Sequence, residues 1–435
     1  MIMIETVRCS DSVSGTVLLP GDKSISHRYA MLASIAEGTS VFGHFASSRD
    51  CHSTLDCLKS LGVELSESGD TVTIRGCGLR GLQAPDDVLE AGNSGTTMRL
   101  ISGILAGHSF VSTIAGDSSL SRRPMGRIIH PLRQMGAEIV SRENDLPPLR
   151  IQGGSLKGIR YVLPVASAQV KSCVLLAGLY GSECTAVQEN IPTRDHTEIA
   201  LKEFGAGVRF AGNWIEVDPG PVLCAQRLTI PGDLSGAAFF LAAAALAPNS
   251  DLYLPLVGLN GRRRELLNYL NQAGLNLTIE NEIEEAGEPR GNLRVRYNHE
   301  FVEGKLPPIR GSRTAALIDE IPVLAVLGSQ VAGGVEISDA GELRIKESDR
   351  ISAIALNLRS MGANVEETPD GLHIPGGQTL HGADIHTRGD HRVAMAFAVA
   401  GLFAHGETKI HDAECADVSF PGFWDALRSV THFNR

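Results

Sequence analysis

The sequence lacks the features that usually hold a metal ion or a membrane. Its eight cysteines include no C-x-x-C pair and no spacing typical of a zinc site. The opening MIMIETVRCSD has neither the basic nor the apolar segment of a secretory signal. The longest apolar runs, near 236–248 and 393–404, are too short to cross a bilayer as helices. We therefore expect a soluble, cytoplasmic protein that has reduced thiols and uses neither a metal nor a membrane.

Positive charge is also scarce. The chain has 39 Lys and Arg residues against 50 Asp and Glu residues, so its formal net charge is −11. Broad binding of nucleic acid or of an anionic membrane requires a basic surface, and this balance argues against both. The motifs G-x-x-x-x-G-K-[ST], H-E-x-x-H and G-x-S-x-G are absent as well. An anionic ligand must therefore be held by a local cluster of Lys and Arg.

What the chain does contain is an internal repeat. One pattern recurs: a loop with Arg, an amphipathic stretch that ends near a Gly, and two short alternating segments. Residues such as Leu55, Leu58 and Leu61 follow helical spacing, and segments such as VTIRG alternate as half-buried strands do. Each copy is therefore predicted to form a helix, a strand, a turn and a strand. The copies lie at 48–76, 122–154, 193–220, from 261 onward, and at 346–377.

Two further features of the repeat bear on packing. Between the copies lie segments of small residues, such as NSGTTMRLISGILAG and GDHRVAMAFAVAGLFAHG. Their near-continuous apolar character predicts helices that are buried on most sides. A glycine follows each repeated helix, where a left-handed cap is common. These glycines are Gly62, Gly136, Gly205, Gly274 and Gly362.

The two ends of the chain are predicted to share a sixth copy. The tail FPGFWDALRSV supplies a helix, and the opening IETVRCSDSVSGTVLLPG supplies two strands. Two PGD segments, at 20–22 and 231–233, then separate two domains of three copies each. We predict an α/β protein in which domain 1 comprises 1–19 plus 233–435 and domain 2 comprises 20–232. The two crossings are expected to be hinges, and the helix after the second one is expected to serve packing.

Charged residues gather where the predicted helices begin. Helix N-termini carry partial positive charge and free N–H groups, and Arg suits phosphate and carboxylate groups. A single loop Arg is usually solvated or a cap, but eight cations at equivalent points of a repeat favour a site for a strongly anionic ligand. Gly95 in NSGTT fits either a capped helix start or close approach of a ligand to the backbone. The cations are Lys23, Arg28, Arg123, Arg127, Arg194, Lys346, Arg350 and Arg392.

Two acids in these clusters could transfer protons, namely Asp319 in IDEIP and Glu347 in KESDR. Asp319 could instead be a charge at a helix N-terminus. Glu347 or Asp349 could instead pair with Arg350, and both kinds of role can hold together. The nearby histidines are each expected to be structural or supporting when taken alone: His27, His196 and His391.

Motifs along essentially the whole chain resemble those of 5-enolpyruvylshikimate-3-phosphate synthases. They are LPGDKSISHR, GNSGTTMRL, RRPMGRI, ASAQVKSCVLLAGL, TRDHTE, IDEIPVLAV, IKESDRI and GDHRVAM, in that order. The resemblance implies transfer of the enolpyruvyl group of phosphoenolpyruvate to the 5-hydroxyl of shikimate 3-phosphate. Phosphate leaves from a tetrahedral intermediate, and no cofactor takes part. The resemblance also implies a two-domain inverted α/β barrel with the active site in the cleft between the domains.

The same resemblance assigns roles to motif residues. Lys23 would assist proton transfer, Asp319 would take the 5-hydroxyl proton, and Glu347 would protonate the methylene carbon. Shikimate 3-phosphate is expected to meet Lys23, Ser24, Arg28, Ser167, Ala168, Gln169, Arg194, Asp319 and Lys346. Phosphoenolpyruvate is expected to meet Lys23, Gly95, Arg123, Gln169, Arg350, His391 and Arg392.

Some details of the resemblance concern a branch of the family. ASAQVK and TRDHT are similar to the class II branch. Val418 stands where many members have a Lys, so a cationic contact to phosphoenolpyruvate is either missing or supplied by Arg127. Because Gly95 leaves room in the phosphoenolpyruvate pocket, the resemblance implies some sensitivity to glyphosate, although the class II features weigh against it.

Two other functions were compared with this one. The transferase that acts on UDP-N-acetylglucosamine is similar in fold, but it expects an Asn where this chain has Ser24 and a cysteine near Arg123. A non-catalytic ring that encircles DNA would need a basic inner face, which the net charge of −11 opposes. A closing two-domain enzyme needs no partner chain, so a monomer is expected.

Overall fold

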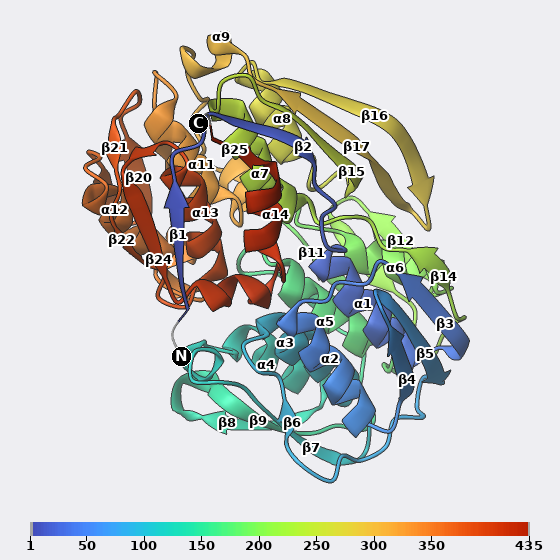
Figure 1. Ribbon diagram of the computed structural model, residues 1–435. Coiled ribbons are helices and arrows are strands. Elements are labelled where there is room, and N and C mark those ends of the chain that lie inside the picture. The colour runs from blue at the N-terminus through green and yellow to red at the C-terminus, as the bar shows by residue number, and fades with distance from the viewer. Residues whose placement is uncertain (1–2, 434–435) are drawn as a thin grey trace. The chain divides into compact units, whose positions relative to one another are not determined.

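A computed structural model gives the structure of residues 3–433. The chain divides into two compact units, each with its own hydrophobic core (Figure 1). Unit 1 comprises Met1–Pro20, Pro231–Ile283 and Pro289–Arg435, and unit 2 comprises Gly21–Ile230 and Glu284–Glu288.

The segment Glu284–Glu288 differs from the predicted domain bounds, which grouped it with the C-terminal half of the chain. Its polar contacts explain why it belongs to unit 2. The Tyr29 hydroxyl donates to the carbonyl of Ala286 at 3.3 Å, and the backbone N–H of Thr229 donates to Glu285 at 3.1 Å. His196 Nδ1 and Glu288 Oε1 lie 2.6 Å apart, and both side chains are buried.

Unit 2 repeats one motif three times, in which two helices accompany a four-stranded sheet. The strand orders are β14-β3-β5-β4, β6-β7-β9-β8 and β10-β11-β13-β12. In each sheet the first pair is parallel and the other two pairs are antiparallel. The helices are α1 (Lys23–Ser34), α2 (Arg49–Ser60), α3 (Gly95–Leu105), α4 (Gly126–Met135), α5 (Ala168–Gly178) and α6 (His196–Glu203). The strands are β3 (Glu37–Gly43), β4 (Glu64–Ser68), β5 (Thr71–Cys77), β6 (Leu89–Glu90), β7 (Val111–Ala115), β8 (Glu138–Arg142), β9 (Leu146–Gln152), β10 (Arg160–Val162), β11 (Thr185–Gln188), β12 (Val208–Ala211), β13 (Trp214–Val217) and β14 (Arg227–Thr229).

Unit 1 has sheets of the orders β16-β17-β15-β2-β25, β18-β20-β19 and β1-β24-β22, and a two-stranded sheet β21-β23. Its helices are α7 (Leu234–Leu246), α8 (Glu265–Gln272), α9 (His299–Val302), α10 (Ser312–Leu317), α11 (Ile321–Gln330), α12 (Arg350–Ser360), α13 (His391–Gly401) and α14 (Phe423–Val430). Its strands are β1 (Ile4–Arg8), β2 (Ser12–Thr16), β15 (Asp251–Gly258), β16 (Asn276–Glu285), β17 (Glu288–Arg296), β18 (Val335–Ile337), β19 (Glu366–Thr368), β20 (Gly371–Ile374), β21 (Leu380–His381), β22 (Asp384–His386), β23 (Ala404–His405), β24 (Glu407–His411) and β25 (Thr431–His432).

The five predicted copies each form a helix followed by two strands. They are α2-β4-β5, α4-β8-β9, α6-β12-β13, α8-β16-β17 and α12-β19-β20. The glycine after each of these helices has a φ between +85° and +110°, in the left-handed region that favours glycine. The prediction of a mixed α/β protein built from repeated helix and sheet units is confirmed.

Strands from the start of the chain complete sheets formed by later segments of unit 1. β1 pairs antiparallel with β24, and Ile4 lies opposite His411. β2 pairs parallel with β15 and antiparallel with β25. These pairings join the opening segment to the tail of the chain within one unit.

The small-residue helices form the interior of each unit. In unit 2, α3 packs directly against α5, and the sheets lie outside these helices (Figure 1). A Cβ added to Gly103 of α3 would lie 2.3 Å from the carbonyl oxygen of Cys173 on α5, so only glycine permits this approach. In unit 1, α11 packs against α13, and every residue of α7 is buried. Because these helices are fixed by close packing, their N-terminal residues are held in defined positions.

Candidate active site

The predicted site residues fall into two groups, which we name the unit 2 group and the unit 1 group. The unit 2 group is Lys23, Ser24, Arg28, Gly95, Arg123, Ser167, Ala168, Gln169 and Arg194. The unit 1 group is Asp319, Lys346, Glu347, Arg350, His391 and Arg392. Most members lie at or just before the first residue of a helix.

Lys23 is the first residue of α1 and is held by a carboxylate. Asp22 caps the helix by accepting from the backbone N–H of Ile25 at 3.0 Å. Lys23 Nζ lies 2.9 Å from Asp50 Oδ2 on α2. Both side chains are largely buried, with 15% of Lys23 and 10% of Asp50 accessible. The backbone carbonyl of Asp50 accepts from the hydroxyl of Thr97 on α3 at 3.4 Å. Asp50 thus joins Lys23 to the start of α3.

Arg28 lies one turn further along α1 and is buried. Its guanidinium donates to Thr197 Oγ1 at 2.7 Å, to Ser172 Oγ at 3.0 Å and to the carbonyl of Ser24 at 2.9 Å. Burial lowers the pKa of Arg28 to about 10, and the nearby charge of Arg194 adds to this effect. Arg28 and Arg194 therefore form a positive group that an anion would stabilise.

A second set of contacts surrounds the N-terminus of α3. Gln169 of α5 accepts from Arg99 Nη1 at 2.8 Å and donates to Thr96 Oγ1 at 2.9 Å. A Cβ on Gly95 would lie 2.6 Å from Arg99 Nη1 and 3.5 Å from Arg123 Nη1. Gly95, Gln169 and Arg123 are therefore brought together, and the side of Gly95 that lacks a side chain faces two guanidinium groups.

Ser167 and Ala168 form the start of α5. Ser167 is the N-cap, and its hydroxyl accepts from the backbone N–H of Val170 at 3.4 Å. Arg194 lies directly before Asp195, the N-cap position of α6. The N-termini of α1, α3, α5 and α6 thus all carry members of the unit 2 group, which is typical of an anion site.

His27 has a structural position, as expected for a histidine on this helix. Its Nδ1 lies 2.7 Å from Thr54 Oγ1, which lies 2.7 Å from Thr97 Oγ1. Burial lowers the pKa of His27 well below its ordinary value, and the charges of Lys23 and Arg28 lower it further. A neutral His27 therefore links α1, α2 and α3.

The unit 1 group is centred on Asp319, between α10 and α11. Three cations lie near its carboxylate: Arg350 Nη1 at 3.6 Å, Arg392 Nη2 at 3.8 Å and Lys346 Nζ at 4.0 Å. Arg392 Nη1 also donates to the backbone carbonyl of Asp319 at 2.7 Å. The alternative in which Asp319 is merely a charge at a helix start does not account for three cations around it.

Arg350 is the most deeply buried member, with 1% of its side chain exposed. It pairs with Glu347 Oε2 at 2.5 Å and with Asp390 Oδ2 at 2.8 Å. Burial by itself lowers the pKa of Arg350, but Asp390 and Glu347 outweigh burial and raise the pKa overall. Asp349 is different: it caps α12 and contacts Arg344 at 2.8 Å. Of the two proposed acidic partners, Glu347 is therefore the one that binds Arg350.

His391 and Arg392 begin α13, which is capped by Asp390. Both side chains are buried, and the capping carboxylate is the one that binds Arg350. Asp390 therefore connects the first turn of α13 to α12.

Sequence reasoning missed three acids of these groups: Asp50, Glu320 and Asp390. Asp390 stands inside the quoted motif GDHR, so its motif was a usable signal. Asp50 follows Lys23 by 27 residues, and Glu320 is buried beside Asp319 with Arg392 Nη1 at 3.9 Å. Glu320 also stands inside a quoted motif, IDEIPVLAV, whereas nothing in the local pattern distinguished Asp50 from an ordinary surface acid.

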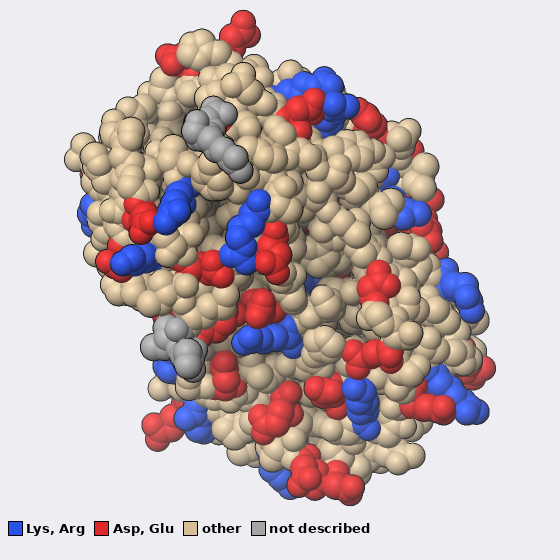
Figure 2. Space-filling view, viewed as in Figure 1, with Lys and Arg blue, Asp and Glu red and all other residues tan. Residues whose placement is uncertain are grey.

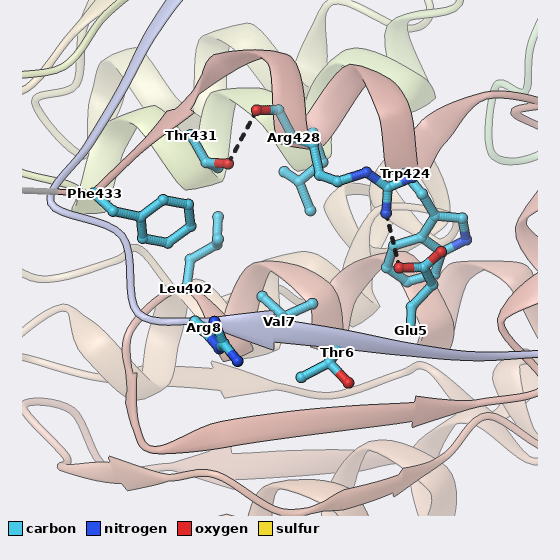
Figure 3. A pocket seen from close by; sticks show the side chains of 10 residues that line it. Glu5, Thr6, Val7, Arg8, Leu402, Trp424, Arg428, Thr431 and Phe433 are labelled. Carbon is cyan, nitrogen blue, oxygen red and sulfur yellow. Dashed lines mark hydrogen bonds and ion pairs between the residues drawn. The ribbon is translucent and has the colours of Figure 1, made fainter.

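A pocket elsewhere in unit 1 contains no predicted site residue. Its lining includes Val7, Leu402, Trp424 and Leu427, with Arg428 bound to Glu5 at its side (Figure 3). Among residues 3–433, no group of three or more His, Cys, Asp or Glu side chains is placed to hold a metal ion. None of the helices formed by these residues combines the length and apolar character that a membrane crossing requires.

The surface charge is mixed. Figure 2 shows one face of the protein, on which Lys and Arg side chains alternate with Asp and Glu side chains. Exposed side chains of opposite charge form direct pairs, such as Arg428 with Asp425 at 2.7 Å and Arg8 with Glu407 at 2.7 Å. This face therefore shows no continuous basic patch.

Known proteins resemble this chain along nearly its whole length. Residues 7–427 match the family model described as EPSP synthase (3-phosphoshikimate 1-carboxyvinyltransferase). A 3-phosphoshikimate 1-carboxyvinyltransferase of Solibacter usitatus is 51% identical over 419 residues, covering 96% of this chain and 97% of the relative. One from Pelotomaculum thermopropionicum is 50% identical over 425 residues, covering 97% of each chain.

A solved structure is similar too. That of EPSP synthase from Acinetobacter baumannii has 40% sequence identity and a TM-score of 0.87, and the match covers 99% of this chain and 98% of that one. The predicted resemblance and the prediction of a transferase are confirmed, and the UDP-N-acetylglucosamine alternative is not favoured. The chain belongs to the EPSP synthase family, the 3-phosphoshikimate 1-carboxyvinyltransferases.

Proposed function

We propose that this chain transfers the enolpyruvyl group of phosphoenolpyruvate to the 5-hydroxyl of shikimate 3-phosphate, using the unit 1 and unit 2 groups together. The observation that best supports these roles is the arrangement around Arg350. Two acids, Asp319 and Glu347, lie within 3.6 Å of a guanidinium that is almost fully buried, yet 17% and 21% of their side chains stay accessible. Accessible acids on a buried cation suit proton transfer to bound ligands.

The unit 2 group is proposed to hold shikimate 3-phosphate. Arg28 and Arg194 supply positive charge, and Ser24, Ser167, Ala168 and Gln169 supply polar groups at helix starts. Arg28 is already fixed by three hydrogen bonds, so little side-chain freedom is lost when an anion binds. Lys346 and Asp319 are proposed to complete the contacts to this substrate.

Phosphoenolpyruvate is proposed to bind Lys23, Gly95, Arg123, Gln169, Arg350, His391 and Arg392. In the chemical step, Glu347 gives its proton to the methylene carbon and C2 becomes electrophilic. Asp319 then accepts the proton of the 5-hydroxyl as that oxygen adds to C2. The three cations around Asp319 favour its ionised form, which is the form that a base requires.

The pairing of Glu347 with Arg350 suggests how one acid can carry a proton. In the structure the two groups form a short ion pair, which favours the carboxylate form of Glu347. An anionic substrate that binds Arg350 competes for that pairing and places negative charge beside Glu347. Substrate binding thereby favours the protonated form of Glu347 at the point where a proton is needed. Elimination of phosphate from the tetrahedral intermediate completes the reaction.

We further propose that the enzyme acts as a cytoplasmic monomer on these two small molecules. Arg127, half-buried in the first turn of α4, is proposed to supply the cation that Val418 does not. Light scattering coupled to gel filtration at working concentration tests the monomer, and a dimer mass contradicts it.

Phosphate release tests the function directly. The purified full-length protein is given phosphoenolpyruvate with either shikimate 3-phosphate or UDP-N-acetylglucosamine. Release only with shikimate 3-phosphate, and its loss in Lys23→Met, is the expected result. Release only with the nucleotide sugar would overturn the acceptor, and release with neither would overturn the proposed activity.

A further inference from the structure

A buried charge cluster lies on α5 and α6, close in sequence to Gln169 and Arg194 of the unit 2 group. It has no role in the proposed reaction. Its centre is Lys171 of α5, whose side chain has no exposed surface. Lys171 Nζ lies 2.6 Å from Glu198 Oε1 on α6 and 3.0 Å from Glu189 Oε2, which follows β11. Both carboxylates are at least nine-tenths buried.

Such a cluster joins two helices at a high cost in desolvation free energy. Removing charges from water costs several kcal/mol per ion, and apolar residues of similar volume often stabilise a fold as well or better. Burial raises the pKa of Glu198, against the opposing effect of Lys171, which agrees with a carboxylate that depends on its cation. Glu198 Oε2 has no hydrogen-bond partner, and Lys171 is the strongest influence that lowers the pKa of this carboxyl. The cluster therefore needs an explanation beyond packing.

The neighbours of the cluster give that explanation. Ser172 follows Lys171 on α5, and Thr197 precedes Glu198 on α6. Their hydroxyls lie 2.6 Å apart, and both accept hydrogen bonds from the guanidinium of Arg28. The ion pair between Lys171 and Glu198 thus fixes the spacing of the two hydroxyls that orient Arg28.

The second carboxylate fixes another cation. Glu189 accepts a short hydrogen bond from the hydroxyl of Thr193, the residue before Arg194. The loop between β11 and α6 is therefore tied to Lys171 at Glu189 and at Glu198, on both sides of Arg194. One buried ammonium group thereby anchors the backbone around Arg194 and the partners of Arg28.

We propose that Lys171, together with Glu189 and Glu198, is a positioning residue for the phosphate of shikimate 3-phosphate, acting through Arg28 and Arg194. This inference rests on the proposed function. It concerns mainly one substrate. Gln169 and Lys23 are assigned to both substrates, but Gln169 is held by Arg99 and Thr96 and Lys23 by Asp50. The other residues assigned to phosphoenolpyruvate in unit 2 also have supports of their own. Arg123 donates to Asn93 at 2.7 Å, and Ser94 caps the helix that begins at Gly95.

The test uses Lys171→Met in the full-length enzyme. Titration calorimetry measures the Kd for shikimate 3-phosphate, and steady-state kinetics at saturating shikimate 3-phosphate gives the KM for phosphoenolpyruvate. We expect the Kd to rise about tenfold to a hundredfold, the scale of losses caused by small displacements of binding groups. The KM for phosphoenolpyruvate should stay within about twofold, as for an interaction that serves one substrate.

Leu175→Ala is the matched control, because Leu175 is a fully buried, uncharged residue of the same helix. It should lower the Tm without raising the Kd. If Lys171→Met does not fold, Glu198→Gln tests the same link while Lys171 keeps Glu189, and a smaller rise in Kd is expected. An unchanged Kd in a folded variant, or an equal rise in Leu175→Ala, overturns the inference. If the wild-type protein itself neither binds nor uses shikimate 3-phosphate, the proposed function fails, and that failure is seen before any variant is made.

Discussion

The unit 1 and unit 2 groups both contain buried arginines, but they support them with different chemistry. Arg28 of unit 2 is held by two hydroxyls and a backbone carbonyl, none of which carries a full charge. Arg350 of unit 1 is held by the carboxylates of Asp390 and Glu347 and has Asp319 nearby. Glu198, Asp22 and Glu288 act on Arg28 through their charge, whereas Asp390 and Glu347 bind Arg350 directly. Direct pairing neutralises more of the positive charge of Arg350 and keeps carboxylates beside it. We propose from this comparison that unit 2 supplies most contacts to shikimate 3-phosphate, and that unit 1 supplies the acids that move protons.

The two PGD segments show a related difference. Asp22 and Asp233 both cap the helix that follows, and the next residue is Lys23 in one copy and Leu234 in the other. The prediction that the second helix serves packing holds for its buried length but omits its first turn. There Ser235 donates a short hydrogen bond to Glu320 and accepts one from Arg263, which lies 3.2 Å from Asp233. The second PGD segment therefore begins a helix whose first turn supports Glu320, the residue beside Asp319.

The largest effect is expected for Lys23→Met, which removes the one unit 2 residue that is assigned both binding and proton transfer. We expect kcat/KM to fall on the order of 10⁴-fold, or about 5.5 kcal/mol of transition-state stabilisation. Lys59→Met is the control, because Lys59 is an exposed α2 lysine paired with Asp56 and Glu67. Equal activity of the two variants in the phosphate-release assay would remove Lys23 from the mechanism.

Glu347→Gln tests the proton-transfer role of unit 1. The amide keeps the shape of the side chain but cannot donate the proton, so kcat should fall by about 10²–10³-fold. The exposed Glu366→Gln on β19 should leave kcat unchanged. A kcat within threefold of wild type in Glu347→Gln would assign the proton donor elsewhere.

Gly95→Ala tests whether the start of α3 in unit 2 serves phosphoenolpyruvate, as proposed. The added methyl group would meet Arg99 Nη1 at 2.6 Å, and the guanidinium must move away from Gln169. We expect the KM for phosphoenolpyruvate to rise about tenfold, a typical effect of one carbon in a fitted pocket. Inhibition by glyphosate should weaken in the same variant. An unchanged inhibition constant would show that Gly95 does not limit access for this inhibitor.

His27→Asn tests the smallest effect, on stability rather than on turnover. The folded-state pKa of His27 lies well below its ordinary value, so below about pH 6.5 protons bind the unfolded state preferentially. Stability is therefore fully present above that pH and is lost as the pH falls, by up to about 1.4 kcal/mol per pH unit. Urea unfolding between pH 7.5 and 5.5 should show a shallower loss in His27→Asn. The exposed His299→Asn should keep the wild-type slope.

The sequence was sufficient for the elements that repeat. Helical spacing, glycines after helices and alternating segments are local signals, so the five helix-strand-strand copies could be predicted before the structure was known. The starts of several helices at the site could also be predicted, because the capping residues Asp22, Ser94 and Asp349 precede them.

Contacts between residues far apart in the sequence could not be predicted. Asp50 binds Lys23, and Glu288 binds His196 across 92 residues, and neither acid differs locally from a surface acid. Lys171 had a weak signal, since it is a lone cation inside the apolar run ASAQVKSCVLLAGL. Its two carboxylate partners, Glu189 and Glu198, could be identified only from the fold, which places α5, α6 and the loop after β11 together.

The most direct test of the difference between the groups is a binding titration of shikimate 3-phosphate alone to the wild type, Arg28→Met and Glu347→Gln. The division of roles predicts at least a tenfold higher Kd for Arg28→Met, since a charged hydrogen bond contributes about 1.5–3 kcal/mol. It predicts a Kd within about twofold of wild type for Glu347→Gln, since that group acts on the other substrate. If Glu347→Gln weakens binding as much as Arg28→Met does, Glu347 also serves shikimate 3-phosphate and the proposed division is wrong.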